Sequence, residues 1–369
     1  VYMGIDARHD HSLRVPRPDL SDSLGSPNAC TQCHTRPEET NAWAAQAIRQ
    51  WYGDKRPDDP HFGPTLLAAQ LGRPEGLDQI RKLLGEETRP DIVRASAVEL
   101  LARYASPEAD TLCREMLDDK SPLVRSAAVR ALSETSLTTF VLEVASKLDD
   151  PVRLVRSAAA RRLVSAASQL VDSRYRELLD QAIAEFKAGQ EAILDRAASH
   201  INLAMLSHAL KSESQAQESI RTAIRLEPYL TGPRDQLAEL LEATKGDPAE
   251  IRRLREEEVE NLARDETLLT ADPQIPYRRG MLLYLLENLA ESRKAFERAC
   301  ELAPHSYNNW LALALLCEKQ EDWDRAYEAL GYMHELQPED PAIREIFRRI
   351  LQTRRAKGET LEPPLKAKE

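Results

Sequence analysis

The sequence is poor in aromatic residues and has no long apolar run. Phe, Trp and Tyr make up 5% of its 369 residues, whereas hydrophobic residues reach 42%. The core must therefore be built from Ala, Leu, Val and Ile, which favours helices packed on helices over an aromatic-rich β-sandwich. The longest apolar run, residues 310–317, is far shorter than the roughly 20 residues that span a bilayer. We predict an all-α fold without a membrane span.

Basic residues are fewer than acidic residues in this chain. The chain has 50 Lys and Arg against 61 Asp and Glu, a net charge of −11. An acidic surface repels phosphate backbones, so no nucleic-acid partner is expected. The first residues lack the basic and apolar segments of a signal peptide. Because the chain starts at Val1, without an initiator Met, we interpret it as a trimmed or mature form.

The first 60 residues differ from the rest in their prolines. Only residues 41–52 are predicted to form a sustained helix, and the remainder of this segment is predicted to be loop. The prolines that interrupt it are Pro16, Pro18, Pro27, Pro37, Pro57 and Pro60. A packed segment made mostly of loop needs a metal or a covalently held cofactor to stabilise it.

Residues 61–170 are helical and repetitive. Three similar segments place their Val-Arg pairs at 93, 124 and 155, a spacing of 31 residues both times. A fixed period of this size indicates stacked helical hairpins, and the pattern resembles short HEAT repeats. We expect each Val to lie in the core and each Arg to pack along the ridge between repeats, in preference to binding an anionic partner.

A second, looser repeat occupies residues 195–356. Units that start near Ala197, Pro273 and Tyr307 align on later prolines, and the last two starts are 34 residues apart. This period resembles the tetratricopeptide repeat (TPR). Three other segments are predicted to be a connecting helix, an irregular helical pair and a flexible tail, at residues 171–194, 231–272 and 357–369, respectively.

The pentad Cys30-Thr31-Gln32-Cys33-His34 is the strongest chemical signal in the chain. Two thiols at this spacing can each add to a vinyl group of one haem, and the adjacent imidazole then binds the iron as the proximal ligand. A structural zinc site needs two further ligands and gives His34 no role. A thioredoxin-like dithiol needs a βαβ context, and a chance pair of unpaired cysteines is the remaining alternative. We predict one covalent haem c at Cys30, Cys33 and His34.

The remaining cysteines and most histidines are predicted to be structural. Three cysteines fall on apolar helix faces and are expected in the core: Cys113, Cys300 and Cys317. Four histidines are expected to be polar residues of helices or turns: His200, His208, His305 and His334. The sequence has no phosphate-binding Gly-rich loop, nucleophile elbow or paired carboxylates, so no catalytic residue is predicted.

Residues 10–53 resemble the haem-bearing region of multihaem c-type cytochromes of the cytochrome c554-like kind that are fused to HEAT and TPR repeats. The resemblance rests on three stretches: Asp10 to Asp19, Gly25 to Cys30, and Trp43 to Gly53. Proteins of that kind carry further haem-binding pentads upstream, whereas this chain has one. The resemblance therefore implies either an N-terminal truncation or haems supplied by another chain.

The haem iron needs an axial ligand on the face opposite His34. His11 is the first choice and His61 the second, whereas His9 is a poor third and Met3 is the only nearby thioether. With either of the first two, the iron would be bis-His and six-coordinate, with a low potential and little room for substrate.

Three functions are consistent with these features. The first, which we predict, is an exported periplasmic or extracellular cytochrome that passes electrons to other haem or redox proteins and docks a protein partner on the concave face of its solenoid. The alternative is a non-redox scaffold for protein–protein interaction, since about 300 residues are repeats without visible catalytic groups. The third is part of a multihaem oxidoreductase complex. We favour a carrier over an enzyme.

Overall fold

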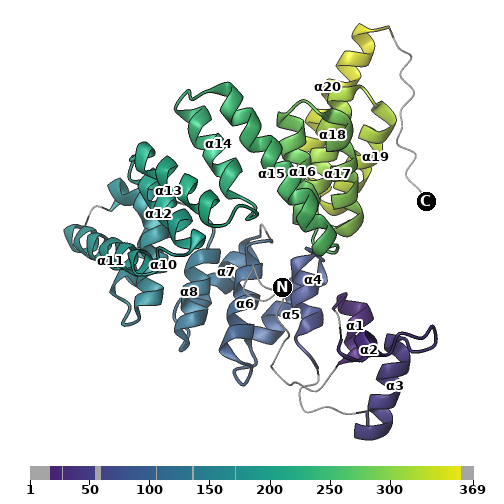
Figure 1. The fold of residues 1–369 in the computed structure, drawn as a ribbon, viewed down its shortest axis with the longest axis horizontal. Helices are drawn as coiled ribbons and strands as arrows, with labels where there is room; N and C mark the ends of the chain where they lie inside the picture. The colour runs from purple at the N-terminus through teal and green to yellow at the C-terminus, as the bar shows by residue number, and fades with distance from the viewer. Residues whose placement is uncertain are drawn as a thin grey trace. The chain divides into compact units, whose positions relative to one another are not determined.

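The computed structural model describes residues 17–26, 28–54, 60–104, 106–134, 137–170 and 172–358. These residues form α-helices and two 3-10 helices and contain no strand, which confirms the all-α prediction (Figure 1). The chain divides into two compact units, Val1–Leu67 and Ala68–Glu369. None of the described helices is long and apolar enough to cross a membrane.

The first unit holds three short helices and the start of a fourth: α1 (Pro18–Leu24), α2 (Cys30–Cys33), α3 (Asn41–Tyr52) and α4 (Gly63–Gln70). The predicted helix at 41–52 is confirmed as α3. The prediction of loop elsewhere is wrong at α1 and α2. Pro18 stands at the start of α1, where a helix loses nothing by lacking an N–H, and Gly25 ends α1 with a left-handed φ of 62°.

The second unit begins with the helices of the 31-residue repeat, called here the HEAT region. They are α5 (Glu75–Leu84), α6 (Asp91–Leu101), α7 (Pro107–Met116), α8 (Pro122–Ala131), α9 (Leu137–Ala145), η1 (Ser146–Asp149), α10 (Arg153–Leu163), η2 (Val164–Gln169) and α11 (Ser173–Glu191). Helix α6 packs on α8, α8 on α10, and α10 on α11. Val93, Val124 and Val155 are buried, as the Val-Arg pattern predicted.

The rest of the second unit, called here the TPR region, consists of paired helices. They are α12 (Ala197–Ala209), α13 (Glu213–Leu226), α14 (Pro233–Ala243), α15 (Pro248–Leu268), α16 (Gln274–Leu285), α17 (Leu289–Leu302), α18 (Tyr307–Gln320), α19 (Trp323–Leu336) and α20 (Pro341–Ala356). Each even-numbered helix from α12 to α18 packs against the next one in the chain. Their core is apolar and includes Phe296, Trp310 and Leu313.

The three cysteines predicted in the core are all buried. Burial raises the pKa of Cys113 and of Cys300 to about 12, and that of Cys317 to about 11. A thiol with so high a pKa is uncharged at neutral pH and unreactive, so these residues act as small core hydrophobes. The chemistry of the remaining pair, Cys30 and Cys33, is therefore a separate question.

Candidate functional site

Helix α2 carries both cysteines of the pentad on a single turn. The side-chain oxygen of Asn28 accepts hydrogen bonds from the backbone N–H groups of Cys30 (3.0 Å) and Thr31 (3.2 Å), which caps the turn. The Asn28 amide donates to Ser21 Oγ of α1 and to Asn41 Oδ1 of α3. One asparagine thus joins the cysteine turn to both neighbouring helices.

His34 ends this turn and has a fixed ring. Its backbone N–H donates to the carbonyl of Cys30 at 2.9 Å. Its Nδ1 lies 3.1 Å from Glu39 Oε1, and its ring packs on Trp43 at a centroid distance of 4.8 Å. The hydrogen bond from His34, followed by that from the backbone of Arg36, lowers the pKa of Glu39. A carboxylate on Nδ1 selects the tautomer whose Nε2 can bind a metal.

The residues of the pentad fit a covalently bound haem. Cys33 is exposed, Cys30 is partly buried, and neither forms a disulfide. The zinc alternative gains no support, because no three His, Cys, Asp or Glu residues gather around a possible metal ion in the described part of the chain. Attachment of haem c at Cys30, Cys33 and His34 stays a prediction. An absorption spectrum and intact mass of the full chain, expressed with a haem-attachment system, test it against Cys30→Ala and Cys33→Ala variants.

Of the two predicted distal ligands, His11 and His61, the structure describes only His61. His11 and His9 lie outside the described residues. His61 stands just before α4, where its Nδ1 accepts a hydrogen bond from the backbone N–H of Gly63 at 3.0 Å and its ring stacks on Phe62. Binding iron through Nε2 would require a proton on Nδ1 and would break the bond from Gly63. The role of His61 as a distal ligand stays a prediction, and this bond weighs against it.

The arginines of the Val-Arg pairs form a ladder of ion pairs between repeats. Arg94 donates to Asp119 and Arg125 to Asp150, each pair 25 residues apart. Arg156 completes the series by pairing with Glu185 of α11 at 2.7 Å. We call these three pairs the ion-pair ladder. Each arginine joins its own repeat to the next helical layer, as the ridge-packing interpretation predicted.

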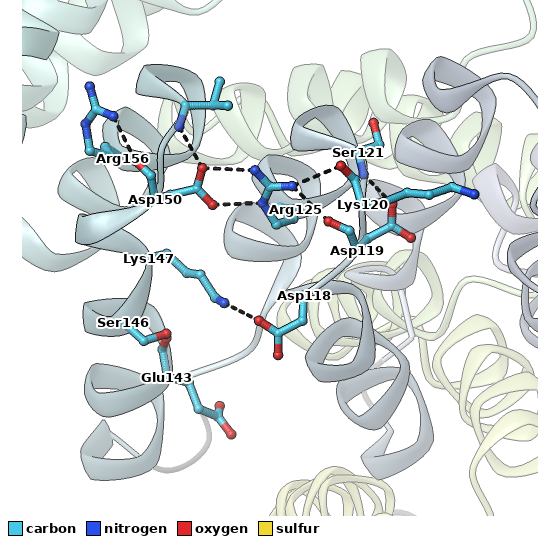
Figure 2. A network of polar contacts seen from close by, with 11 residues as sticks. Asp118, Asp119, Lys120, Ser121, Arg125, Glu143, Ser146, Lys147, Asp150 and Arg156 are labelled. Carbon is cyan, nitrogen blue, oxygen red and sulfur yellow. Dashed lines mark hydrogen bonds and ion pairs between the residues drawn. The ribbon is translucent and has the colours of Figure 1, made fainter.

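In two of the three rungs, the acidic residue, Asp119 or Asp150, also closes the turn before the following helix. Asp150 receives Arg125 and, at 2.9 Å, the backbone N–H of Val152, while its carbonyl accepts a hydrogen bond from Arg156 (Figure 2). Burial by itself would raise the pKa of Asp150, but the hydrogen bonds from Arg125 and Val152 outweigh it and hold the pKa below its ordinary value. Asp150 is therefore a charged group with both of its carboxylate oxygens engaged.

A row of exposed apolar residues follows the same repeat. Ile92, Leu123 and Leu154 are each the second residue of their helix, in α6, α8 and α10, and they are 62%, 39% and 43% exposed, respectively. We call this row the aliphatic stripe. Its spacing of 31 residues is visible in the sequence, directly before each Val-Arg pair. The stripe was not predicted from the sequence, because the interpretation of the repeat rested on the Val and the Arg of each pair.

Comparison with protein-family models identifies both kinds of repeat. Residues 77–164 match the model for HEAT repeats, and residues 277–306 match the model for the tetratricopeptide repeat. The two repeat types predicted from the sequence periods are thereby confirmed. The comparison with curated proteins found no match to the chain.

Solved structures with similar folds share little sequence with this chain. A crystal structure of MamA is 15% identical and covers 50% of this chain and 94% of its own, with a TM-score of 0.31. The Cut9 and Hcn1 hetero-tetramer of APC/C is 13% identical and covers 83% of this chain and 59% of its own, with a TM-score of 0.40. Yeast Tom70 is 15% identical, with coverages of 85% and 69% and a TM-score of 0.36. Similarity at this level is no guide to function.

The classification of the whole chain as an electron-transfer cytochrome is wrong. Both matching models describe protein repeats. The specific part of the resemblance is confined to residues 10–53, whereas helical repeats make up most of the chain and their fold implies no redox chemistry. The class that these findings support is a repeat scaffold.

Proposed function

We propose that the chain is a scaffold for protein–protein interaction and that its aliphatic stripe contacts the partner. Stacked helical hairpins expose an extended surface along which another protein can lie. Both repeat types in this chain form such stacks, which supports a protein partner over a small-molecule substrate.

The observation that carries this proposal is the recurrence of the stripe. A single exposed Leu or Ile is ordinary on a protein surface. Ile92, Leu123 and Leu154, in contrast, occupy the same position in three successive repeats and are all solvent-exposed. An apolar row that repeats with the architecture is typical of an interaction surface.

The ion-pair ladder gives the stripe a fixed spacing. Arg94 and Asp119 connect the layers that carry Ile92 and Leu123, and Arg125 and Asp150 connect those that carry Leu123 and Leu154. Both pairs are largely shielded from water, so the layers cannot slide without breaking buried charged hydrogen bonds. A partner therefore meets three anchors already held in place, which lowers the entropic cost of binding.

Photo-crosslinking tests the proposal directly. A benzoylphenylalanine is placed at Leu123 of the full chain in its native cell, and at Leu268 of α15 as the control, since Leu268 is exposed but lies outside the stripe. The expected result is one discrete crosslinked protein from position 123 and none from 268. Equal crosslinking at both positions, or none at 123, would contradict the proposal.

A triple variant then measures the contribution of the stripe. Replacing Ile92, Leu123 and Leu154 by Gln is expected to weaken binding of the crosslinked protein at least tenfold while leaving the helical content unchanged, because all three side chains are exposed. The matched control replaces three exposed leucines of the TPR region by Gln: Leu226, Leu268 and Leu285.

Export of the chain stays a prediction, which fractionation of the native cell tests.

A further inference from the structure

A cleft opens where the last HEAT helices meet the first TPR hairpin. Helices α10, η2, α11 and α12, the turn after α12 and Arg130 of α8 line it, and its volume is about 850 Å³. That is within the range of sites that hold several residues of a peptide or a small ligand. Leu154, the last residue of the aliphatic stripe, lines it, so the stripe runs into the cleft.

Positive charge gathers in this cleft on a chain whose net charge is −11. Five arginines and lysines line it, against Glu185 as the one carboxylate among the described residues there. Glu185 is already engaged by Arg156 in the ion-pair ladder. The lining cations are Arg130, Arg153, Arg161, Arg162 and Lys211.

Three of these cations have no carboxylate within ion-pair distance in the described part of the chain: Arg153, Arg161 and Lys211. Arg130 and Arg162, by comparison, pair with Glu99 and Glu134. Crowding by surrounding protein atoms, together with the charge of Arg130, lowers the pKa of Arg161. An arginine next to like charge gains most from an incoming anion.

The floor of the cleft is apolar. The Arg161 guanidinium lies over the ring of Phe186 at 5.6 Å, and its Nη2 is 3.9 Å from the sulfur of Met205. Phe186 and Leu206 form the buried base, whereas Met205 is half-exposed. Flexible methionine beside an aromatic ring accommodates apolar side chains of several shapes.

We propose that this cleft binds an acidic peptide segment of the partner protein, with one large apolar side chain of the segment inserted between Phe186, Met205 and Leu154. The acidic residues on either side of that anchor pair with Arg153, Arg161 and Lys211. This proposal rests on the scaffold function and identifies the chemistry of what the scaffold binds. The charges decide between occupants, because an apolar segment alone would leave the three cations unpaired.

Gly189 offers a way to fill the cleft without disturbing the core. It lies in α11 and lines the cleft, and a Cβ added to it meets nothing within 4 Å. Gly189→Trp should therefore block the cleft from inside while keeping a regular helix. Gly331→Trp is the matched control, because Gly331 lies in α19, is similarly half-buried, has equally open space and is remote from the cleft in sequence.

The experiment selects 12-residue peptides from a random phage-displayed library on the full chain and measures their affinity by fluorescence anisotropy. The expected peptides carry one Phe, Leu, Met or Trp flanked by Asp and Glu. Gly189→Trp should weaken their binding at least tenfold, as should Arg153→Gln combined with Arg161→Gln, and Gly331→Trp should not change it. The affinity should also fall as salt concentration rises.

Three results would overturn the cleft proposal: no selected peptide, peptides without acidic enrichment, or equal affinity for wild type and Gly189→Trp. Tighter binding of a dT12 oligonucleotide than of the selected peptides would also overturn it. None of these results would contradict the scaffold function, because crosslinking at Leu123 tests that function independently. Conversely, peptide binding that is lost in Gly189→Trp, together with no crosslink at Leu123, would support the cleft proposal and contradict the proposal that the aliphatic stripe contacts the partner.

Discussion

The HEAT and TPR regions have the same helical-hairpin architecture but differ in how deeply the ion pairs between their hairpins are buried. In the HEAT region, consecutive layers are joined by buried ion pairs such as Arg94 with Asp119, whose side chains are 3% and 8% exposed. In the TPR region, the ion pair of Arg293 with Asp322 is more exposed, at 31% and 34% of the two side chains, and Trp310 stacks on Tyr332 within one hairpin at a centroid distance of 4.1 Å. The comparison teaches that one architecture can be joined by ion pairs that are shielded from water or by ion pairs that remain open to it.

Removal of Asp119 is expected to have the largest effect on stability. Asp119→Ala leaves the buried Arg94 guanidinium, whose Nε already lacks a partner, without its carboxylate, and it leaves the N–H of Ser121 without an acceptor. Breaking one side of a buried pair costs about 3–5 kcal/mol. Denaturant unfolding, with hydrogen exchange at α6 and α8 to locate the loss, measures it.

The matched change in the TPR region is Glu318→Ala. Glu318 pairs with Arg349 at 2.6 Å, but the arginine side chain is 42% exposed and regains water when its partner is removed. We expect a loss of at most about 1 kcal/mol. Equal losses for Asp119→Ala and Glu318→Ala would show that the two regions do not differ as described.

The apolar fit of the TPR region can be broken at a glycine. A Cβ on Gly280 would lie 2.7 Å from two ring carbons of Phe296, which is almost completely buried and cannot move aside. Gly280→Ala is therefore expected to destabilise the chain by about 1–3 kcal/mol. Gly331→Ala, in open space within α19, should instead stabilise it by up to about 1 kcal/mol. Thermal unfolding compares the two, and the same sign for both would contradict the prediction.

Acidification is expected to act on Asp150 and Glu258 in opposite directions. The pKa of Asp150 is held below its ordinary 3.8, so its stabilising contribution is present above about pH 4 and is lost as pH falls through the folded-state value. Burial raises the pKa of Glu258 in α15 above its ordinary 4.5, although the N–H of Gly232 and Arg278 lower it. Its contribution is full below pH 4.5 and is lost as pH rises through the folded-state value.

Glu258→Gln isolates the second of these effects. The amide retains an acceptor for the N–H of Gly232 and removes a buried charge whose second oxygen has no partner. At pH 7 the variant is expected to unfold roughly 2 °C above wild type, and the difference should shrink as pH is lowered from 7 through the folded-state pKa and the wild-type carboxyl protonates. A difference that stays constant over this range would contradict the raised pKa. Hydrogen exchange at α10, corrected for its intrinsic pH dependence, should show no gain over the same range.

The smallest effect is expected at the exposed edge of the HEAT region. Asp118 pairs with Lys147 at 2.6 Å, but its side chain is 86% exposed (Figure 2). Asp118→Ala should change the free energy of unfolding by less than about 0.5 kcal/mol. A loss comparable to that of Asp119→Ala, measured in the same denaturant series, would mean that burial does not decide the strength of these pairs.

The fold of the second unit could be predicted from the sequence, whereas the residues that form its ion pairs could not. Scarce aromatics, abundant Ala and Leu, and the two periods sufficed for helical repeats. Two Asp-Asp pairs, at 118–119 and 149–150, precede α8 and α10, and the sequence alone does not distinguish their members. In the structure the second Asp of each pair turns inward to an arginine 25 residues earlier, and the first stays exposed.

The candidate sites divide in the same way. The pentad at Cys30 to His34 is contiguous and can therefore be recognised in the sequence. The contact of the Glu39 carboxylate with the His34 ring was not predicted. The cleft beside Arg161 was invisible, because its walls come from four separate stretches between residues 130 and 211 that meet only on folding. Local chemistry can be read from neighbouring residues, whereas a concave surface depends on tertiary packing.

The regularity of the ion-pair ladder makes the length of the HEAT region adjustable. If residues 120–150 were excised, Asp119 would still receive Arg94, the N–H of Val152 would replace that of Ser121 on its carboxylate, and Arg156 would take the place of Arg125 on its carbonyl. Every rung would keep a donor and an acceptor, and only Leu123 would be lost from the stripe. The HEAT region could thus be shortened or lengthened by whole repeats, with the ion pairs between neighbouring repeats unchanged.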